Sequence, residues 1–175
     1  MSDAEKIGVE NDAENGVVIE VIPGTEVVTA GKGDILLRRL TLRSNLVKLI
    51  TISRCGDDDK PTNLYDIRDM GNGYFNIVFN DSEISEHHCV IYKSDGKYYL
   101  YDGIWYLKNG KFSRSNISAD GEQLEPFQTH PSTNGTYHTR GAFRDIRRLD
   151  NGEKKELKTG DKITACRYAF EIEIR

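Results

Sequence analysis

The chain lacks long apolar runs, has few cysteines and carries no excess of positive charge. No apolar stretch approaches the roughly 18–20 residues that a membrane-spanning helix needs, so we expect no membrane partner. Three cysteines in 175 residues are too few and too scattered for a disulfide framework. The first residues have no apolar segment like that of a signal peptide. We therefore expect an intracellular protein of the nucleus or cytoplasm.

The balance of charge excludes another class of function. The formal net charge is −4, and residues 1–15 account for all of it, because they hold five acidic side chains and one lysine. The remainder of the chain is formally neutral. A nucleic-acid binder that depends on bulk positive charge is therefore not expected. We predict a flexible acidic tail over residues 1–15 and one domain over residues 16–175.

What the sequence does have is a succession of short β patterns separated by turn signals. The expected strands are residues 17–22, 35–42, 46–52, 74–79, 89–92, 98–101 and 168–174, with a hairpin over 106–112. Pro23-Gly24 is expected to end the first strand. Residues 55–70 are interpreted as a polar loop and 113–131 as a surface insertion. With no amphipathic helix, the pattern predicts an all-β sandwich or barrel.

Four short motifs occur in order on this β pattern. They are Arg54 directly after an apolar strand, Ser85-x-x-His88 before another, Ser132-Thr133-Asn134-Gly135-Thr136, and Leu157-Lys158-Thr159-Gly160-Asp161-Lys162-Ile163. This order resembles the forkhead-associated (FHA) domain family over about residues 17–175. The resemblance implies an eleven-stranded β-sandwich that recognises phosphothreonine peptides through loops at one end. It also implies a protein–protein interaction module in signalling, with no enzymatic activity and no cofactor.

The residue types suit the binding of a phosphate dianion. Arg54 offers a planar, permanently charged fork for two phosphate oxygens. Ser85 can donate its hydroxyl, and the resemblance adds the main-chain amide beside it, at Glu86. The resemblance assigns Asn134 to the main chain of the ligand. It assigns Thr133 to the phosphate or to the wall that receives the threonine methyl group.

Two further residues of these motifs are expected to support the site. The resemblance implies that His88 braces the binding loops through hydrogen bonds. The Asn-Gly pair in the third motif favours a turn with positive φ, so Gly135 is expected to shape that turn.

The sequence departs from the family pattern around the arginine. Ser53 replaces the glycine that usually precedes it, and Ser85 follows Arg54 by 31 positions. Arg68, 17 residues before Ser85, has a spacing nearer that of the family. The better apolar strand precedes Arg54, over residues 49–52. The sequence therefore favours Arg54 and leaves Arg68 as the alternative.

Acidic residues flank the serine motif. Glu83 matches a position that reads the third residue after the phosphothreonine in some relatives. We hypothesise that Glu83 disfavours an acidic residue there and favours lysine or arginine. Glu86 would repel a phosphate if its carboxylate pointed inward.

Three other readings are weighed against this one. An enzyme is disfavoured, because no nucleophile–base pair, phosphate-binding glycine loop or carboxylate dyad stands out. His87-His88-Cys89 is not expected to bind a metal, since neighbouring strand residues point to opposite faces. An FHA-like scaffold that binds a protein partner without phosphate stays open. A secreted carbohydrate-binding sandwich would use the Asn80, Asn116 and Asn134 sequons, but no signal peptide supports it.

Overall fold

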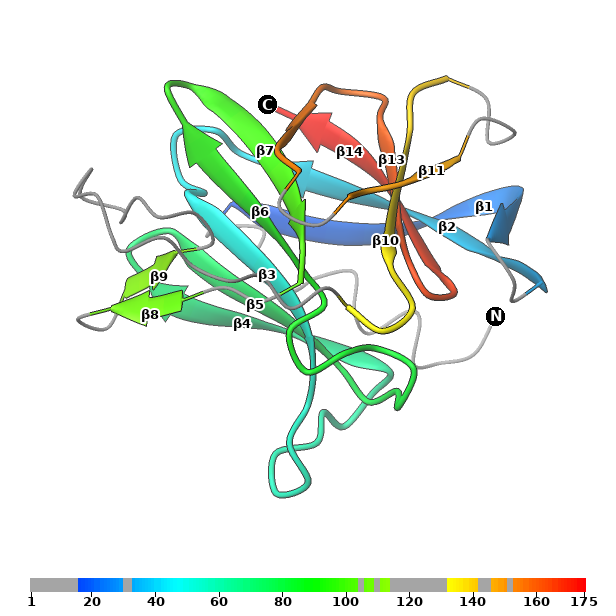
Figure 1. Cartoon of the computed structure of the whole chain (residues 1–175), viewed down its shortest axis with the longest axis horizontal. Coiled ribbons are helices and arrows are strands. Elements are labelled where there is room, and N and C mark those ends of the chain that lie inside the picture. The colour runs from blue at the N-terminus through cyan, green and yellow to red at the C-terminus, as the bar shows by residue number, and fades with distance from the viewer. Residues whose placement is uncertain are drawn as a thin grey trace.

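The computed structural model describes two β-sheets that face each other, together with a separate two-stranded hairpin (Figure 1). It describes residues 16–29, 33–103, 106–108, 111–113, 132–141, 146–150 and 153–175. All of the regular elements in these ranges are strands. Within them, no helix is long and apolar enough to cross a membrane. The predicted acidic tail and most of the predicted surface insertion lie outside the described residues.

Each of the two large sheets has six strands. The first sheet consists of β1 (Val17–Thr29), β2 (Gly33–Leu42), β14 (Tyr168–Ile174), β13 (Lys162–Ala165), β10 (Thr136–Thr139) and β11 (Arg147–Arg148), in this spatial order. The second consists of β12 (Lys155–Leu157), β7 (Lys97–Asp102), β6 (Cys89–Ser94), β3 (Leu49–Arg54), β5 (Tyr74–Phe79) and β4 (Tyr65–Gly71). Neighbouring strands are antiparallel except for the parallel pairs β14–β2 and β3–β5.

The core lies between the two sheets. Ile52, Phe79 and Phe170 belong to one continuous cluster of buried side chains contributed by both sheets. The rings of Phe79 and Tyr168 lie with their centroids 4.3 Å apart across the interface. Burying one such aliphatic or aromatic side chain contributes about 1.5–3 kcal/mol. This packing fixes the strand ends from which the functional loops start.

The predicted β-sandwich is confirmed, with twelve strands in its two sheets where eleven were expected. The hairpin predicted over 106–112 is present as β8 (Tyr106–Lys108) paired with β9 (Lys111–Ser113).

Two local predictions are wrong. Residues 55–70 are only partly loop, because β4 begins at Tyr65 and alternates Tyr65 and Ile67 into the core. Pro23-Gly24 does not end the first strand. Instead β1 continues, and its register against β2 shifts between Val21 and Glu26. A proline is tolerated there because β1 is an edge strand and the irregularity removes the need for its missing N–H.

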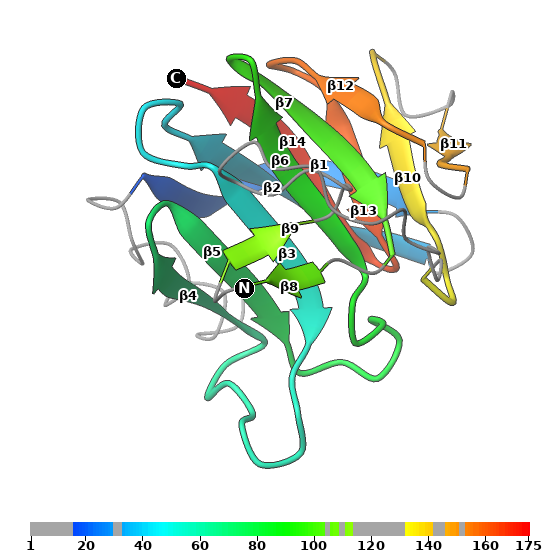
Figure 2. The ribbon, with the colours of Figure 1, turned by 60° about the vertical axis from the view of Figure 1, so that its left-hand side comes forward.

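The functional loops gather at one end of the sandwich. Both views of the ribbon place the loop after β3, the loop between β5 and β6 and the turn before β10 at this end (Figures 1 and 2). These are the segments that carry the first three sequence motifs.

Candidate functional site

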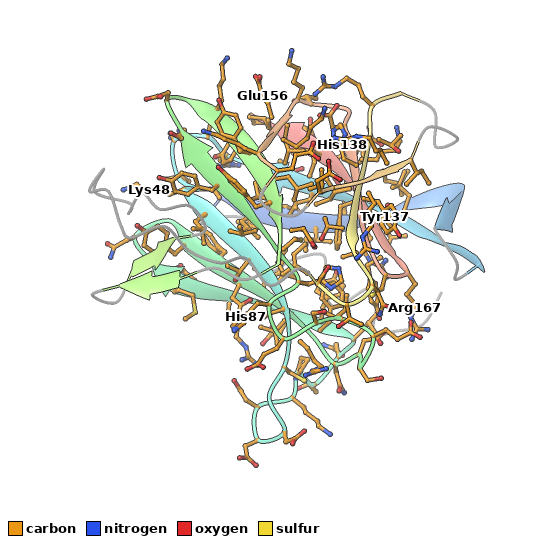
Figure 3. The ribbon with its side chains drawn as sticks, viewed as in Figure 1. Lys48, His87, Tyr137, His138, Glu156 and Arg167 are labelled. Atoms are coloured by element: carbon orange, nitrogen blue, oxygen red, sulfur yellow. The ribbon has the colours of Figure 1, made fainter. Side chains whose placement is uncertain are left out.

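A hollow of about 170 Å³ opens among these three segments. Its lining residues are Arg54, Ser82, Glu83, Ile84, Ser85, Glu86, Thr133 and Asn134. All six residues predicted to contact a ligand therefore line a single hollow. His87 and Arg167 mark opposite sides of this end of the molecule in Figure 3.

Arg54 ends β3 with an exposed side chain. Its main-chain N–H donates to the Ser85 carbonyl at 3.0 Å, which ties the end of β3 to the β5–β6 loop. Among the described residues, no acidic side chain forms an ion pair with its guanidinium. Arg54 therefore presents a fixed backbone and an uncommitted positive charge to the hollow.

His88 joins the two loops that form the rest of the hollow. Its Nδ1 accepts the main-chain N–H of Ser85 at 3.1 Å, and its Nε2 lies 2.8 Å from the Gly135 carbonyl. A carbonyl only accepts, so the proton is on Nε2 and the ring is neutral. Burial lowers the pKa of His88, which keeps this neutral form near pH 7. The imidazole acts as a brace between the β5–β6 loop and the turn before β10.

Two hydrogen bonds orient the polar groups that face the hollow. The main-chain N–H of Thr133 donates to the Ser85 hydroxyl oxygen at 3.0 Å. The Asn134 side-chain amide donates to the Glu83 carbonyl at 2.8 Å. Since the Ser85 oxygen accepts in this contact, its proton is available to a ligand. The amide oxygen of Asn134 is available in the same way.

Asp102 holds the turn before β10 from beneath, and the sequence reasoning missed this role. Its buried carboxylate accepts from the Ser132 hydroxyl at 2.5 Å, the Ser132 N–H at 3.1 Å and the Thr136 hydroxyl at 2.6 Å. Within that turn, Gly135 has a φ of 82°, and a Cβ there would lie 2.6 Å from the Arg148 Nε. The available signal was an aspartate that ends an apolar strand.

Asp81 fastens the β5–β6 loop to the β13–β14 turn and was also missed. Its carboxylate accepts from the Glu83 N–H at 2.9 Å, the Tyr168 hydroxyl at 2.5 Å and Arg167 at 2.9 Å. Burial alone would raise the pKa of Asp81, but these donors outweigh burial and lower it. Cys166 adds a contact from its Sγ to the Glu83 carbonyl at 2.8 Å. The only local signal for this role is an aspartate two residues before the N–H that it accepts.

Arg68, the alternative arginine, lies outside this hollow. It is on β4, where its guanidinium pairs with Asp59 and lies 3.5 Å from the Asp66 carboxylate. The structure thus brings Arg54, and not Arg68, together with Ser85 and Asn134.

The two glutamates that line the hollow differ in their surroundings. The positive charge of Arg167 acts on Glu83. Glu86 is exposed, and no cation among the described residues pairs with its carboxylate. Glu86 is therefore the stronger negative charge beside Arg54.

The histidine–cysteine segment is not arranged as a metal centre. Both ring nitrogens of His88 are occupied by protein groups, and Cys89 is buried in the core. Over the described part of the chain, no group of three His, Cys, Asp or Glu side chains could hold a metal ion.

A β-sandwich whose end loops hold fixed hydrogen-bond donors around a free guanidinium has the construction of a module that binds an anionic ligand. The family model of the FHA domain matches residues 68–165, more than half of the chain, and the chain belongs to the FHA family. FHA domains are phosphoprotein-interaction modules and not enzymes. The match starts at Arg68, so β1, β2 and β3 lie outside it. No curated protein matches the chain.

Proposed function

We propose that the chain binds threonine-phosphorylated peptides in the hollow lined by Arg54, Ser85 and Asn134. In this proposal Arg54 takes two phosphate oxygens, the Ser85 hydroxyl and the Glu86 main-chain amide take others, and Asn134 holds the main chain of the ligand. The observation that carries the proposal is the free Arg54 guanidinium beside the oriented Ser85 hydroxyl. Three separate segments supply these groups, and hydrogen bonds to the buried His88 ring join two of these segments.

The expected affinity follows from the number of charged contacts. A charge-assisted hydrogen bond contributes about 1.5–3 kcal/mol. Two or three of these, less the cost of ordering a peptide, give dissociation constants near the micromolar range. A peptide without phosphate is then expected to bind too weakly to measure.

Selection of threonine over serine rests on a smaller term. Burying one methyl group contributes roughly 0.8 kcal/mol, which is only about fourfold in affinity. Thr133 is the proposed wall for this methyl group. Stronger discrimination requires the hollow to fix the rotamer of the ligand as well, and the bracing by His88 and Asp102 favours such rigidity.

Glu83 is proposed to act on specificity. Its carboxylate would disfavour an acidic residue at the third position after the phosphothreonine. The nearby charge of Arg167 weakens this effect. We also propose an intracellular location, which the three free cysteines favour.

The test is a titration of one fluorescent peptide in three forms, phosphothreonine, phosphoserine and unmodified, chosen from a phosphopeptide array. Arg54→Ala is compared with Arg68→Ala, since both remove one guanidinium from the same end of the sandwich. Losing the bidentate contact should weaken phosphopeptide binding about 30-fold for Arg54→Ala, or about 2 kcal/mol. Arg68→Ala should stay within twofold for a peptide that has no basic or acidic flanking residue. Equal binding of the plain peptide would favour the phosphate-independent scaffold, and a reversed effect of the two variants would reassign the arginine.

A further inference from the structure

A second hollow of about 210 Å³ adjoins the first. It lies next to the segment that connects β3 to β4, and its lining includes Asp59, Arg68 and His87. Arg54 and Glu86 line both hollows. The two hollows are therefore neighbours, and a ligand anchored on Arg54 in the first has the second beside it.

Hydrogen bonds fix several of the side chains that line the second hollow. The Asn76 side-chain oxygen accepts from the Thr51 and Ser53 hydroxyls at 2.9 Å each, which fixes the floor contributed by β3 and β5. Val78 adds a buried apolar side chain to the lining. On the far wall, Arg68 binds both the carboxylate and the main-chain carbonyl of Asp59. This combination suits a long side chain with an apolar stem and a polar end.

The charged residues around the second hollow indicate which charge a bound ligand side chain would carry. Arg68 is paired with Asp59 and lies near Asp66, so two carboxylates already surround its single positive charge. Glu86 has no pairing cation in the described structure. Once Arg54 is committed to a phosphate in the first hollow, the charges around the second hollow sum to an excess of negative charge. A second phosphate is disfavoured there, because it would have to displace Asp59 from Arg68.

We propose that this second hollow binds a lysine or arginine side chain of the same phosphopeptide, with Glu86 and Asp59 as its acceptors. The chain would thus select phosphothreonine in a basic sequence context. This inference rests on the proposed function and names the peptide class that the site accepts. Glu86, which opposes phosphate binding by simple repulsion, acquires a role as the acceptor for the neighbouring cation.

The test uses one phosphothreonine peptide of neutral flanking sequence, with lysine, alanine or glutamate placed in turn at each of the four positions on either side. Wild type, Glu86→Gln and Asp57→Asn are titrated with each peptide by fluorescence anisotropy. Asp57→Asn is the matched control, since it removes one exposed acid from the same end without changing the lining. The unmodified form of each peptide is titrated in parallel.

We expect one flanking position at which lysine binds about two- to fivefold tighter than alanine, the range for exposed ion pairs. Glu86→Gln should weaken this preference and Asp57→Asn should keep it. Glu86→Lys should reverse it, so that a glutamate at that peptide position binds tighter than a lysine. If phosphopeptides bind without any basic preference, or if both variants reduce it equally, the second-hollow assignment is wrong while the proposed function stands. If no peptide shows phosphate dependence, the proposed function itself is wrong, and this inference with it.

Discussion

Asp81 is one of the residues that hold the ligand-binding loops in place, and removal of its carboxylate should reduce both stability and phosphopeptide affinity. Asp81→Asn preserves the size of the side chain but replaces one acceptor oxygen with an NH₂ group. The main-chain N–H of Glu83, the Tyr168 hydroxyl and two N–H groups of Arg167 all point at the carboxylate. A neutral amide oxygen cannot serve all of these donors, and the new NH₂ group faces donors. We therefore expect the junction between the β5–β6 loop and the β13–β14 turn to loosen.

The magnitude follows from the exposure of each partner. Tyr168 is only 3% exposed, and leaving its hydroxyl unpaired costs about 1–3 kcal/mol. The Arg167 side chain is 51% exposed and can be solvated again, so its pair contributes about 1 kcal/mol or less. Asp81→Asn should therefore reduce the free energy of unfolding by about 1–4 kcal/mol. For a domain of this size that lowers the Tm by roughly 2–16 °C.

The assay combines thermal unfolding with phosphopeptide titration. Because Ser85 lies in the same loop, we expect the Kd of Asp81→Asn to rise about three- to tenfold at a temperature where the variant is fully folded. Asp69→Asn is the control, since Asp69 is an exposed acceptor for the Gly71 N–H in the β4–β5 turn. A Tyr168→Phe background removes one of the donors and should halve the loss of stability. An Asp81→Asn Tm within 2 °C of wild type would refute the reasoning.

Three further changes test the framework. Asp161 is 2% exposed, and burial alone would raise its pKa, but hydrogen bonds from Arg140 and His138 lower that pKa to about 2 from 3.8. This shift contributes about 2 kcal/mol of stability, which is present above pH 3.8 and is lost as the pH falls toward 2. Asp161→Asn should lose this amount at pH 7 and flatten the fall of stability in acid, and identical pH profiles of unfolding for the variant and wild type would contradict it. Gly135→Ala should lower both Tm and phosphopeptide affinity because its Cβ meets Arg148 at positive φ, whereas Gly56→Ala, in open space, should leave the Tm unchanged. The buried Tyr98 hydroxyl donates to the Val47 carbonyl, and Tyr98→Phe leaves this carbonyl unpaired, so the free energy of unfolding in urea should fall by about 1–3 kcal/mol. A fall below about 0.5 kcal/mol would count against this hydrogen bond.

The longer strands were predictable because each is a run rich in apolar and aromatic residues. The strand over residues 74–79 was predicted with its observed bounds, and that over 168–174 likewise. The strand over Thr136–Thr139 has no such pattern. It buries threonine and histidine side chains and exists through its pairing with β13. A short polar strand of this kind is defined by its neighbours and leaves little trace in local sequence.

The candidate site divides in the same way. Arg54, Ser85 and Asn134 were named from the sequence because they belong to short motifs at loop positions. Asp81 and Asp102 were not named as site residues, because their partners are distant in the sequence. The Tyr168 hydroxyl that binds Asp81 is 87 residues away, and the Ser132 hydroxyl that binds Asp102 is 30 residues away. Contacts of this range follow from the packing of the two sheets and not from local spacing.

The carboxylate of Asp102 has a consequence for how this chain can vary. It accepts hydrogen bonds from the main-chain N–H and the side-chain hydroxyl of Ser132, so the two ends of the segment between Asp102 and Ser132 are held together. The segment between these two residues is 29 residues long in this chain, and the hydrogen bonds that join its ends do not depend on its length. Doubling the length of such an excursion costs only about 0.6 kcal/mol in chain entropy. We therefore expect this segment to accept an inserted sequence, such as a reporter or an epitope, without a change in the positions of the ligand-binding loops.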